Sequence, residues 1–345
     1  MSSSWTRLRD LDVRCVRVRL EVRSSRTAAG WVRRTTLVAL EDGEGGVGIG
    51  EDVTYDGDVH AARAGREPID LRHEGTLASL SRALDGFAFA REGEYTRWAL
   101  ESAALDLALV RAGRNLGDVL GLERRPVRFV VSQGLGRGAN VGVLREVLAA
   151  APDARFKIDF SNEFTEATVR ALADLGRVDV LDLKGHYRTG AFRGPEPDAR
   201  LYAAIAEALP DAWLEDPWID DATRDALRPH LARVTYDAPL HSLDDLLAIE
   251  PAPRCINVKP SRFATVRELC AVVDHCRSNG VAMYAGGQFE LDRGRAQIQE
   301  LASLWYPDGP NDAAPPVYNR RPFDGRPTAS PLAPQDVSGF GPSAA

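Results

Sequence analysis

The chain has 345 residues, of which 44% are hydrophobic, so it can bury a large core and form two domains. A formal net charge of −7, with no basic patch that contains interleaved aromatic residues, argues against a nucleic-acid partner. No apolar run approaches the roughly 18 residues of a membrane-spanning helix, and the N-terminus lacks the apolar segment of a signal peptide. We therefore expect a cytoplasmic protein with no membrane partner.

The four cysteines have neither the spacing of a metal site nor that of a disulfide framework. They are Cys15, Cys255, Cys270 and Cys276. We expect them to pack as small apolar side chains.

Apolar and charged residues alternate in three runs near the start of the chain, which predicts an antiparallel meander with one buried face. The runs lie at residues 11–22, 31–41 and 47–51. Two loops, at residues 24–30 and from Asp52 to about Gly65, flank this meander. From residue 75 to 120 the pattern becomes helical, with Gly113 as a C-cap. The first 125 residues are thus expected to form an α+β domain.

From Pro126 onwards, apolar runs alternate with helical patterns, which is typical of a parallel sheet built from βαβ units. Seven or eight such units in about 200 residues favour a closed barrel over an open sheet. We expect the barrel to span residues 126–319, and a Pro- and Gly-rich tail at 320–345 either to wrap the surface or to be mobile. The expected strands are 127–133, 154–160, 178–184, 212–216, 233–237, 255–259 and 281–287, with a weaker eighth near 312–318.

Charged residues stand at the ends of successive expected strands. Glu215, Asp237 and Lys259 follow one another at steps of 22 residues, and Asp182 ends the strand before them. A lone carboxylate after a strand is most often a solvated loop residue. Several on neighbouring barrel strands lie close together, repel one another, and suit a hard cation such as Mg²⁺ better than zinc.

Lysines in the same expected strands are candidates for proton transfer. Lys259 is either an ordinary surface lysine or, near a bound cation, an amine whose charged form is disfavoured and which serves as a base. Lys157 and Asp159 point to one face of their strand because the side-chain period of a strand is two. A buried Lys–Asp pair that only holds the strand is the alternative reading of those two residues.

Residues 10–319 resemble the enolase superfamily, in its mandelate racemase and muconate lactonizing enzyme branch. The resemblance rests on GIGE, ALESAALDLALVRAG and LGDVLG in the first domain, and on WLEDP, TYDAPLHSLDDL, INVKPS and MYAGGQFE in the second. It implies an α/β fold, a (β/α)7β TIM-like barrel with an N-terminal α+β capping domain. It also implies Mg²⁺ on Asp182, Glu215 and Asp237, and a base that removes the proton alpha to a substrate carboxylate.

Two strands depart from the pattern of that family. Where the family often has Lys-x-Lys, this chain has Lys157, Ile158 and Asp159, and where Asp-x-Asn is usual it has Asp182, Leu183 and Lys184. Lys184 is expected to pair with Asp159, to bind a substrate anion, or to weaken the metal site.

The resulting hypothesis is a Mg²⁺-dependent lyase or isomerase that acts on a small carboxylate. Lys259, Lys157 and Asp159 are the candidate catalytic residues. Lys184 and, from the last motif, Gln288 and Glu290 are the candidate substrate-binding residues. Two alternatives remain open: a barrel that binds a ligand without metal-dependent turnover, and a Schiff-base aldolase that uses Lys259 or Lys157. The resemblance is compatible with a homo-oligomer, and the loops at 24–30 and 52–65 are expected to set the substrate.

Overall fold

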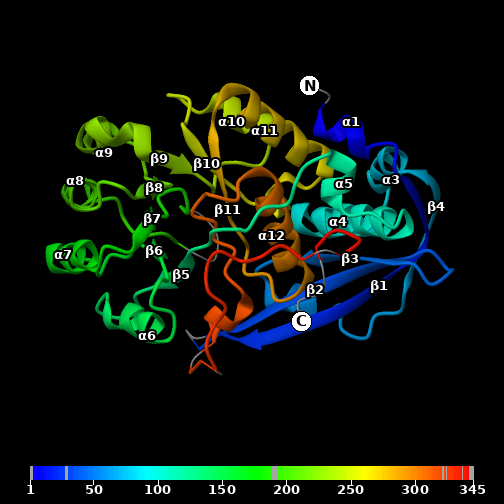
Figure 1. Cartoon of the computed structure of the whole chain (residues 1–345), viewed down its shortest axis with the longest axis horizontal. Helices are drawn as coiled ribbons and strands as arrows, with labels where there is room; N and C mark the ends of the chain where they lie inside the picture. Colours follow the sequence, from blue (N-terminus) through cyan, green and yellow to red (C-terminus); the bar gives the residue numbers. More distant parts are fainter. Residues whose placement is uncertain are drawn as a thin grey trace.

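The computed structural model describes residues 3–27, 30–188, 193–320, 322–323, 325–335 and 337–341. A four-stranded sheet with its helices forms one side of the molecule, and a curled parallel sheet surrounded by helices forms the other (Figure 1).

The first sheet is antiparallel and has the strand order β3-β2-β1-β4. Its expected meander is present, but β1 continues to Arg26, so part of the expected loop at 24–30 is strand. The expected loop at 52–65 contains the short helix α2 (Gly57–Ala61). The strand β4, which pairs with the free edge of β1, was not predicted from the sequence. The strands are β1 (Asp12–Arg26), β2 (Val32–Glu41), β3 (Val47–Asp52) and β4 (Ile69–Thr76).

The long helix α4 (Glu94–Arg111) packs directly against β3, and glycines make this close approach possible. A Cβ atom at Gly48 would lie 2.2 Å from the carbonyl oxygen of Ala103, and one at Gly50 would lie 2.0 Å from that of Ala99. The GIGE motif therefore reflects helix–sheet contact. Gly113, just after α4, adopts a φ of 61°, as expected for a C-cap glycine. The other helices of this side are α1 (Ser4–Leu8), α3 (Leu77–Leu84), η1 (Ala88–Arg91) and α5 (Leu116–Leu120).

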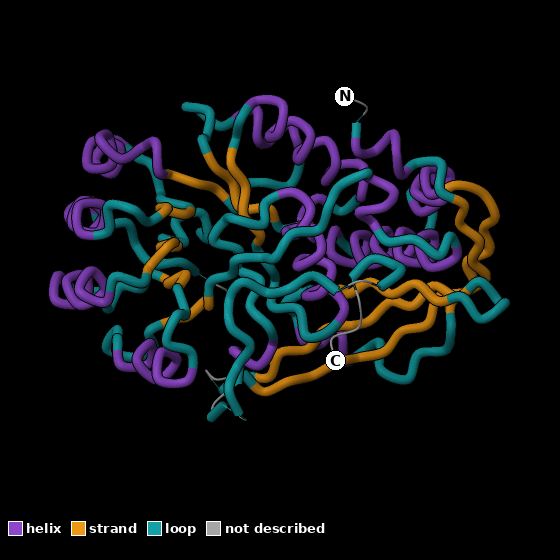
Figure 2. Tube along the Cα trace, viewed as in Figure 1, coloured by secondary structure: helices purple, strands orange, loops and turns teal. Residues whose placement is uncertain are grey.

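All seven predicted strands of the second domain are present and form one parallel sheet in chain order, β5 to β11. The strands lie inside and the helices outside, as Figure 2 shows most clearly for α6 to α9. The strands are β5 (Val131–Gly134), β6 (Phe156–Asp159), β7 (Val178–Asp182), β8 (Trp213–Glu215), β9 (Val234–Tyr236), β10 (Cys255–Val258) and β11 (Ala282–Ala285). The helices are α6 (Gly142–Ala150), α7 (Glu166–Leu175), α8 (Ala199–Ala208), α9 (Asp221–Leu227), α10 (Leu243–Ala248), α11 (Val266–Asn279) and α12 (Arg293–Trp305), with the 3-10 turns η2 (Arg228–Arg233), η3 (Pro260–Phe263) and η4 (Pro316–Asn319).

A short segment around Asn311 closes the gap between the last strand and the first. The carbonyl oxygen of Asn311 accepts a hydrogen bond of 2.8 Å from the backbone N–H of Val130, just before β5. Asn311 also forms an isolated parallel bridge with Phe129. The next residue, Asp312, donates a backbone hydrogen bond of 2.8 Å to Ala285 of β11. The weak eighth strand expected near 312–318 is thus reduced to this bridge.

The described part of the C-terminal tail wraps the molecule. Leu332 pairs with Val127 at the start of the barrel domain, and Gly339 pairs with Asn115. Phe340 is fully buried, and its backbone N–H donates a hydrogen bond of 2.7 Å to Asp106 of α4. Of the two alternatives for the tail, wrapping describes these residues.

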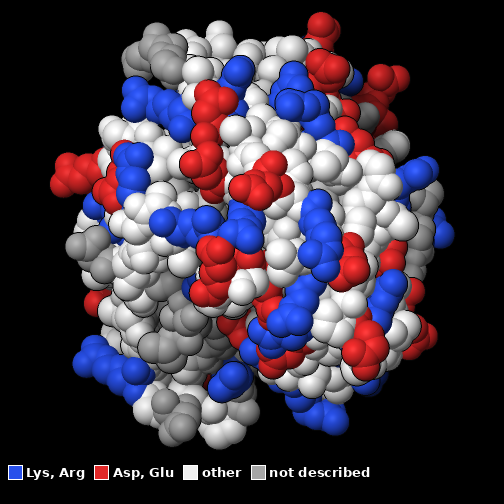
Figure 3. Space-filling view, turned by 90° about the vertical axis from the view of Figure 1, so that its right-hand side faces the viewer, with Lys and Arg blue, Asp and Glu red and all other residues white. Residues whose placement is uncertain are grey.

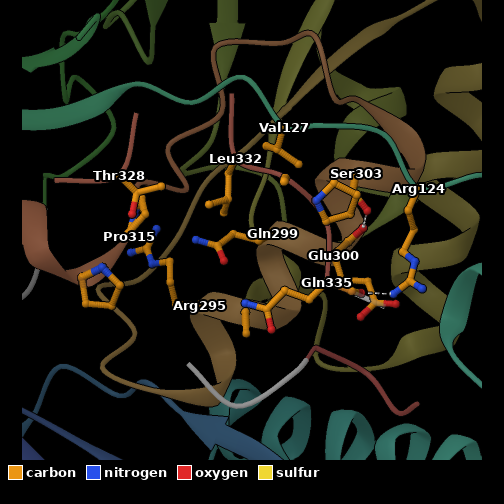
Figure 4. A pocket seen from close by; sticks show the side chains of 14 residues that line it. Arg124, Val127, Arg295, Gln299, Glu300, Ser303, Pro315, Thr328, Leu332 and Gln335 are labelled. Atoms are coloured by element: carbon orange, nitrogen blue, oxygen red, sulfur yellow. Dashed lines mark hydrogen bonds between the residues drawn. The ribbon is translucent and has the colours of Figure 1, made fainter. Parts of the chain in front are cut away.

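A cavity of about 280 Å³ lies between α12 and residues 328–335 of the tail. Figure 4 shows side chains of α12, among them Gln299 and Glu300, facing the tail residues Leu332 and Gln335. Its polar groups are largely engaged with the protein itself. Gln299 donates a hydrogen bond of 2.8 Å to the carbonyl oxygen of Ala313, for example.

All four cysteines are buried and unpaired, as expected for small apolar side chains. In the ranges that the structure covers, no helix is both long enough and apolar enough to span a bilayer. Acidic and basic side chains are interspersed on the face shown in Figure 3.

Candidate active site at the carboxyl ends of the barrel strands

Four neighbouring barrel strands bring carboxylates to one edge of the sheet. Asp159 pairs in register with Asp182, Asp182 with Glu215, and Glu215 with Thr235, two residues before Asp237. Parallel strands in register end at the same edge, so these side chains gather at the mouth of the barrel. The sequence-based expectation that strand-end carboxylates converge is therefore met for Asp182, Glu215 and Asp237, and Asp159 joins them.

Glu215 is fully buried at the centre of this group and has three side-chain partners. Its Oε1 lies 2.5 Å from the Nζ of Lys157 and accepts a hydrogen bond of 3.1 Å from Asn257. Its Oε2 accepts a hydrogen bond of 2.6 Å from the hydroxyl of Tyr284. The partners come from β6, β10 and β11, so Glu215 ties opposite sides of the barrel interior together.

Asp182 shares two ammonium groups with its neighbours. The Nζ of Lys184 lies 2.7 Å from Asp182 and 3.0 Å from Asp159, and the Nζ of Lys157 lies 3.6 Å from Asp182. Lys184 adopts a φ of 50°, a left-handed conformation that is uncommon for a residue with a side chain. This backbone turn accompanies the placement of its ammonium group between the two carboxylates. Of the expected roles for Lys184, pairing with Asp159 is thus observed.

Asp237 pairs with the candidate base. Its Oδ2 lies 2.5 Å from the Nζ of Lys259, and its Oδ1 lies 3.6 Å from the Nε of Arg262. Asp216 fixes the backbone of this segment. Its two carboxylate oxygens accept hydrogen bonds of 2.9 and 2.8 Å from the backbone N–H groups of Asp237 and Ala238. Asp216 adopts a φ of 50°, so a second strand end at the mouth has a left-handed backbone.

Several titratable groups at the mouth have shifted pKa values. Burial raises the pKa of Glu215 to about 7; Lys157 opposes this shift, and Asp182 adds to it. Burial, together with Asp237, also raises the pKa of Asp216 well above its usual range. Burial acts in the same direction on Asp182, but Lys184 and Lys157 outweigh it and leave its pKa below the usual range. The buried carboxylates are therefore only partly neutralised by the lysines.

Lys259 differs from the expectation that its ammonium form is disfavoured. Burial lowers its pKa, but the carboxylate of Asp237 outweighs burial, so the pKa lies above its ordinary value. The reason is the ion pair of 2.5 Å, which no local sequence pattern reveals. In this arrangement Lys259 carries a proton that Asp237 holds in place.

The donor set fits a hard cation. Oxygen atoms of Asp182, Glu215 and Asp216 all lie within 4.8 Å of one another. Among the described residues, the carboxylate oxygens of Asp237 face the cationic groups of Lys259 and Arg262, whereas those of Asp216 are engaged by backbone N–H groups. Carboxylate oxygens are the ligands that Mg²⁺ prefers. The geometric group thus contains two of the three expected ligands, with Asp216 beside Asp237.

The two expected substrate-binding residues after β11 have separate surroundings. The Nε2 of Gln288 donates a hydrogen bond of 3.1 Å to the hydroxyl of Tyr95 on α4, so Gln288 faces the capping domain. Glu290 pairs with Arg295 of α12 at 3.2 Å and accepts a hydrogen bond of 2.6 Å from the backbone of Gln288. The structure does not bring Glu290 to the carboxylates described above.

Sequence reasoning missed several residues of the mouth. Arg262 donates a hydrogen bond of 3.0 Å to the hydroxyl of Tyr187, so the loop after β7 reaches across to the segment after β10. Residues 189–192 of that loop lie outside the described residues. The sequence did contain a cue to both residues. Arg262 comes three residues after the candidate base Lys259, and Asp216 comes directly after the candidate ligand Glu215.

Comparisons with known proteins agree with this architecture. The chain matches the family DUF8230, a domain of unknown function, in two parts. The family's N-terminal domain matches residues 6–119, and its C-terminal domain matches residues 123–320. The o-succinylbenzoate synthase of Geobacillus kaustophilus is 26% identical over 263 residues, which cover 68% of this chain and 61% of that protein.

Solved structures resemble most of the chain. A dipeptide epimerase from Enterococcus faecalis V583 superposes with a TM-score of 0.68 at 16% identity, covering 96% of this chain and 100% of that one. A 2-chloromuconate cycloisomerase from Rhodococcus opacus gives 0.62 at 17% identity, with 85% of each chain covered. A protein from Listeria innocua, described as a member of the enolase superfamily, gives 0.63 at 17% identity, covering 88% of this chain and 85% of the other. These likenesses confirm the expected TIM-like barrel with an N-terminal capping domain.

Proposed function

Since the chain belongs to the DUF8230 family and has the fold of the enolase superfamily, we propose that it is a Mg²⁺-dependent enzyme that removes the proton alpha to the carboxylate of a small organic acid. The outcome is elimination or isomerisation, so the protein is a lyase or an isomerase.

The observation that carries this proposal is the convergence of buried carboxylates and amines at one edge of the barrel. Asp182, Glu215 and Asp237 come from three consecutive strands and are almost completely buried. Buried charges that are only partly paired are costly, and a divalent cation removes that cost. Together with the fold, this supports Asp182, Glu215 and Asp237 as the ligands, and Asp216 as the group that positions Asp237.

Magnesium bound there would supply a fixed positive charge, which stabilises the negative charge that develops on the substrate carboxylate as the proton leaves. The lysines supply the remaining functions. Lys157 is on β6 and Lys259 directly follows β10, and the three strands β7 to β9 separate them, so they approach the mouth from different sides. To act as the base, Lys259 would have to leave its ion pair with Asp237 and give its proton to water, after which the neutral amine accepts the α-proton.

Lys184 and Asp159 are assigned to the side of the site nearest solvent. The side chain of Lys184 is 18% exposed and that of Asp159 is 37% exposed, whereas Lys157 is only 3% exposed. An ammonium group at the entrance can bind the substrate carboxylate and orient it, with Asp159 fixing the position of that ammonium group. The resulting arrangement has amines on both sides of the mouth, which suits either a lyase or an isomerase.

One observation favours a second candidate, a barrel that binds a ligand without metal-dependent turnover. Each of the three proposed ligands already has a lysine partner: Asp182 has Lys184, Glu215 has Lys157 and Asp237 has Lys259. These ammonium groups neutralise part of the charge that a cation would otherwise neutralise.

Calorimetric titration of Mg²⁺ and thermal melting with excess Mg²⁺ or EDTA test the proposal. A ligand that binds only the folded state, at about 100 times its Kd, adds about 2.7 kcal/mol to the free energy of unfolding. We expect Mg²⁺ to bind and stabilise the wild type and Glu207→Gln, a control that lacks one exposed carboxylate on α8, but not Asp237→Asn.

Deuterium uptake by small carboxylic acids in D₂O then reports removal of the α-proton, which we expect to require both Mg²⁺ and Lys259. Magnesium binding by Asp237→Asn, or exchange that persists in EDTA, would contradict the proposal. No response of the wild type to Mg²⁺ would favour the binding barrel, and trapping of a substrate by borohydride would reveal a Schiff-base lysine instead.

A further inference from the structure

Three aromatic side chains lie where the capping domain meets the segment after β11, and two of them are partly exposed. Trp31 is 42% exposed and Tyr55 is 55% exposed, and Trp31 contacts Phe289 with ring centroids 5.6 Å apart. Trp31 and Tyr55 belong to the capping domain, whereas Phe289 follows β11 of the barrel. We call Trp31, Tyr55 and Phe289 the aromatic rim.

A single buried arginine fixes the segments that carry the rim. Arg33, which is 1% exposed, donates hydrogen bonds to the carbonyl oxygens of Val53 and Thr54, both at 2.6 Å, next to Tyr55. It also donates to the carbonyl oxygens of Gln288 at 2.9 Å and Phe289 at 3.2 Å. The guanidinium group lies 4.5 Å from the centre of the Tyr55 ring. One side chain thus joins both domains and orients the rim.

Phe289 has a strained backbone. Its φ of 59° is left-handed, which is a genuine outlier for a bulky residue. Such a conformation costs on the order of 1–3 kcal/mol, and it persists only where the surroundings impose it, often at ligand sites. The hydrogen bond from Arg33 to the carbonyl oxygen of Phe289 is one such constraint.

Tyr95 and Gln288 connect the rim to the capping domain. Gln288 precedes Phe289 and donates its hydrogen bond of 3.1 Å to the Tyr95 hydroxyl. Burial raises the pKa of Tyr95 to about 12. The hydrogen bond between Gln288 and Tyr95 joins the segment that carries Phe289 to α4, and this is the side towards which we place the substituent of a ligand whose carboxylate is held by the lysines.

We propose that the aromatic rim binds a flat, apolar group, so that the substrate is a carboxylic acid with an aryl or similar cyclic substituent. Exposed aromatic rings at fixed positions stack on such a group with little loss of side-chain entropy, and the amines of the mouth hold the carboxylate. This inference deepens the proposed function and rests on it for the position of the carboxylate.

Calorimetric titration with two probes tests this inference, first with excess Mg²⁺ and then in EDTA. The probes are 4-phenylbutyrate and butyrate, which differ only in the phenyl group. We expect the wild type to bind 4-phenylbutyrate about tenfold more tightly than butyrate, or better. Trp31→Ala and Tyr55→Ala should each reduce that ratio several-fold and leave butyrate binding unchanged. Both residues are exposed, so the variants should fold.

Leu247→Ala is the matched control, because Leu247 is an apolar residue of α10 that is 57% exposed and lies outside the rim. It should keep the wild-type ratio. Equal affinity for the two probes, no measurable binding of 4-phenylbutyrate, or a ratio unchanged in Trp31→Ala would overturn the inference. Light scattering gives a further test. If Trp31→Ala changes the molar mass in solution but not the affinity for 4-phenylbutyrate, the rim contacts a second copy of the chain and the inference is overturned.

The two conditions separate this inference from the proposed function. A phenyl preference that persists in EDTA supports the rim even if Mg²⁺ neither stabilises the protein nor promotes deuterium uptake. Conversely, Mg²⁺-dependent exchange without a phenyl preference supports the proposed function and overturns the rim.

Discussion

The ammonium group of Lys184 lies 3.0 Å from the carboxylate of Asp159 on the neighbouring strand. The two residues are the two departures from the usual pattern of the family, and they face each other. Asp159 at the end of β6 stands where the resemblance implies a lysine, and Lys184, two residues after β7, supplies an ammonium group at the same side of the mouth. We therefore treat the two departures as one compensated pair.

This compensation predicts energetic coupling between positions 159 and 184. Asp159→Lys alone places two ammonium groups together and should destabilise the fold, whereas the double variant with Lys184→Asn should recover most of the loss. We expect a coupling free energy of about 1 kcal/mol or more from a double-mutant cycle in urea. The exposed pair Glu166 and Arg170, 3.7 Å apart, is the control and should show coupling near zero. Additive effects at 159 and 184 would refute the compensation.

Tyr284→Phe tests whether Glu215 depends on its neutral partner. The change removes the hydroxyl that donates a hydrogen bond of 2.6 Å to the Oε2 of Glu215, so a buried acceptor loses its partner. In EDTA the free energy of unfolding should fall by about 1–3 kcal/mol. Tyr306→Phe is the control, since the Tyr306 hydroxyl is buried without a hydrogen-bond partner among the described residues. Removing that hydroxyl should cost no more than about 0.5 kcal/mol. Equal losses in the two variants would contradict this role for Tyr284.

A pH-dependent contact joins the two domains. The Nδ1 of His241, between β9 and α10, lies 2.8 Å from a carboxylate oxygen of Glu94 on α4. This hydrogen bond raises the pKa of His241 above 6.5, its usual value. Because the folded-state pKa is the higher one, the stabilisation is complete below pH 6.5 and is lost as pH rises through the folded-state value.

Melting temperatures of the wild type and Glu94→Gln between pH 5.5 and 8.5 test that contact. The wild type should lose stability relative to Glu94→Gln as the pH rises past the folded-state pKa, and the difference should be largest at the acidic end. His241→Asn should show the same reduced dependence as Glu94→Gln. Parallel curves for wild type and Glu94→Gln would show that the pair does not stabilise the fold.

The tail contributes to the core of the capping domain, so shortening one tail side chain should destabilise the protein. Phe340→Ala removes a fully buried ring and should cost about 3–5 kcal/mol in the free energy of unfolding measured in urea. Val337→Ala, which truncates a side chain that is 41% exposed in the same tail, should change stability by no more than about 0.5 kcal/mol. Similar small effects of both changes would mean that the tail only covers the surface.

The barrel could be predicted from the sequence because its strands are short, apolar and separated by amphipathic helices of regular length. The strand β4 was missed because only one of its side chains, Leu71, is fully buried, so its apolar signal is faint. The eighth strand, expected near 312–318 on a weak signal, is only an isolated bridge at Asn311, because a single polar residue pairs there and no apolar run accompanies it.

The positions of the site were predictable, but its pairings were not. A strand-end carboxylate is visible in the sequence because β-structure ends there. That Lys259 would be held by Asp237, or that Asp216 would support Asp237, depends on contacts between residues about 20 positions apart. Such contacts are set by the register of neighbouring strands, which the amino-acid pattern of one strand does not contain.

The tail also has a consequence for how the two domains are packed. Phe340 packs in the same core as α4, and its backbone N–H donates a hydrogen bond to Asp106, so a residue that follows the barrel in the sequence completes the core of the first domain. At the other end, Ser4 donates hydrogen bonds of 2.7 and 2.6 Å to Asp274 on α11 of the barrel. Each domain therefore takes part of its packing from a segment that is distant in the sequence, so the capping domain has its complete core only when the tail up to Phe340 is in place.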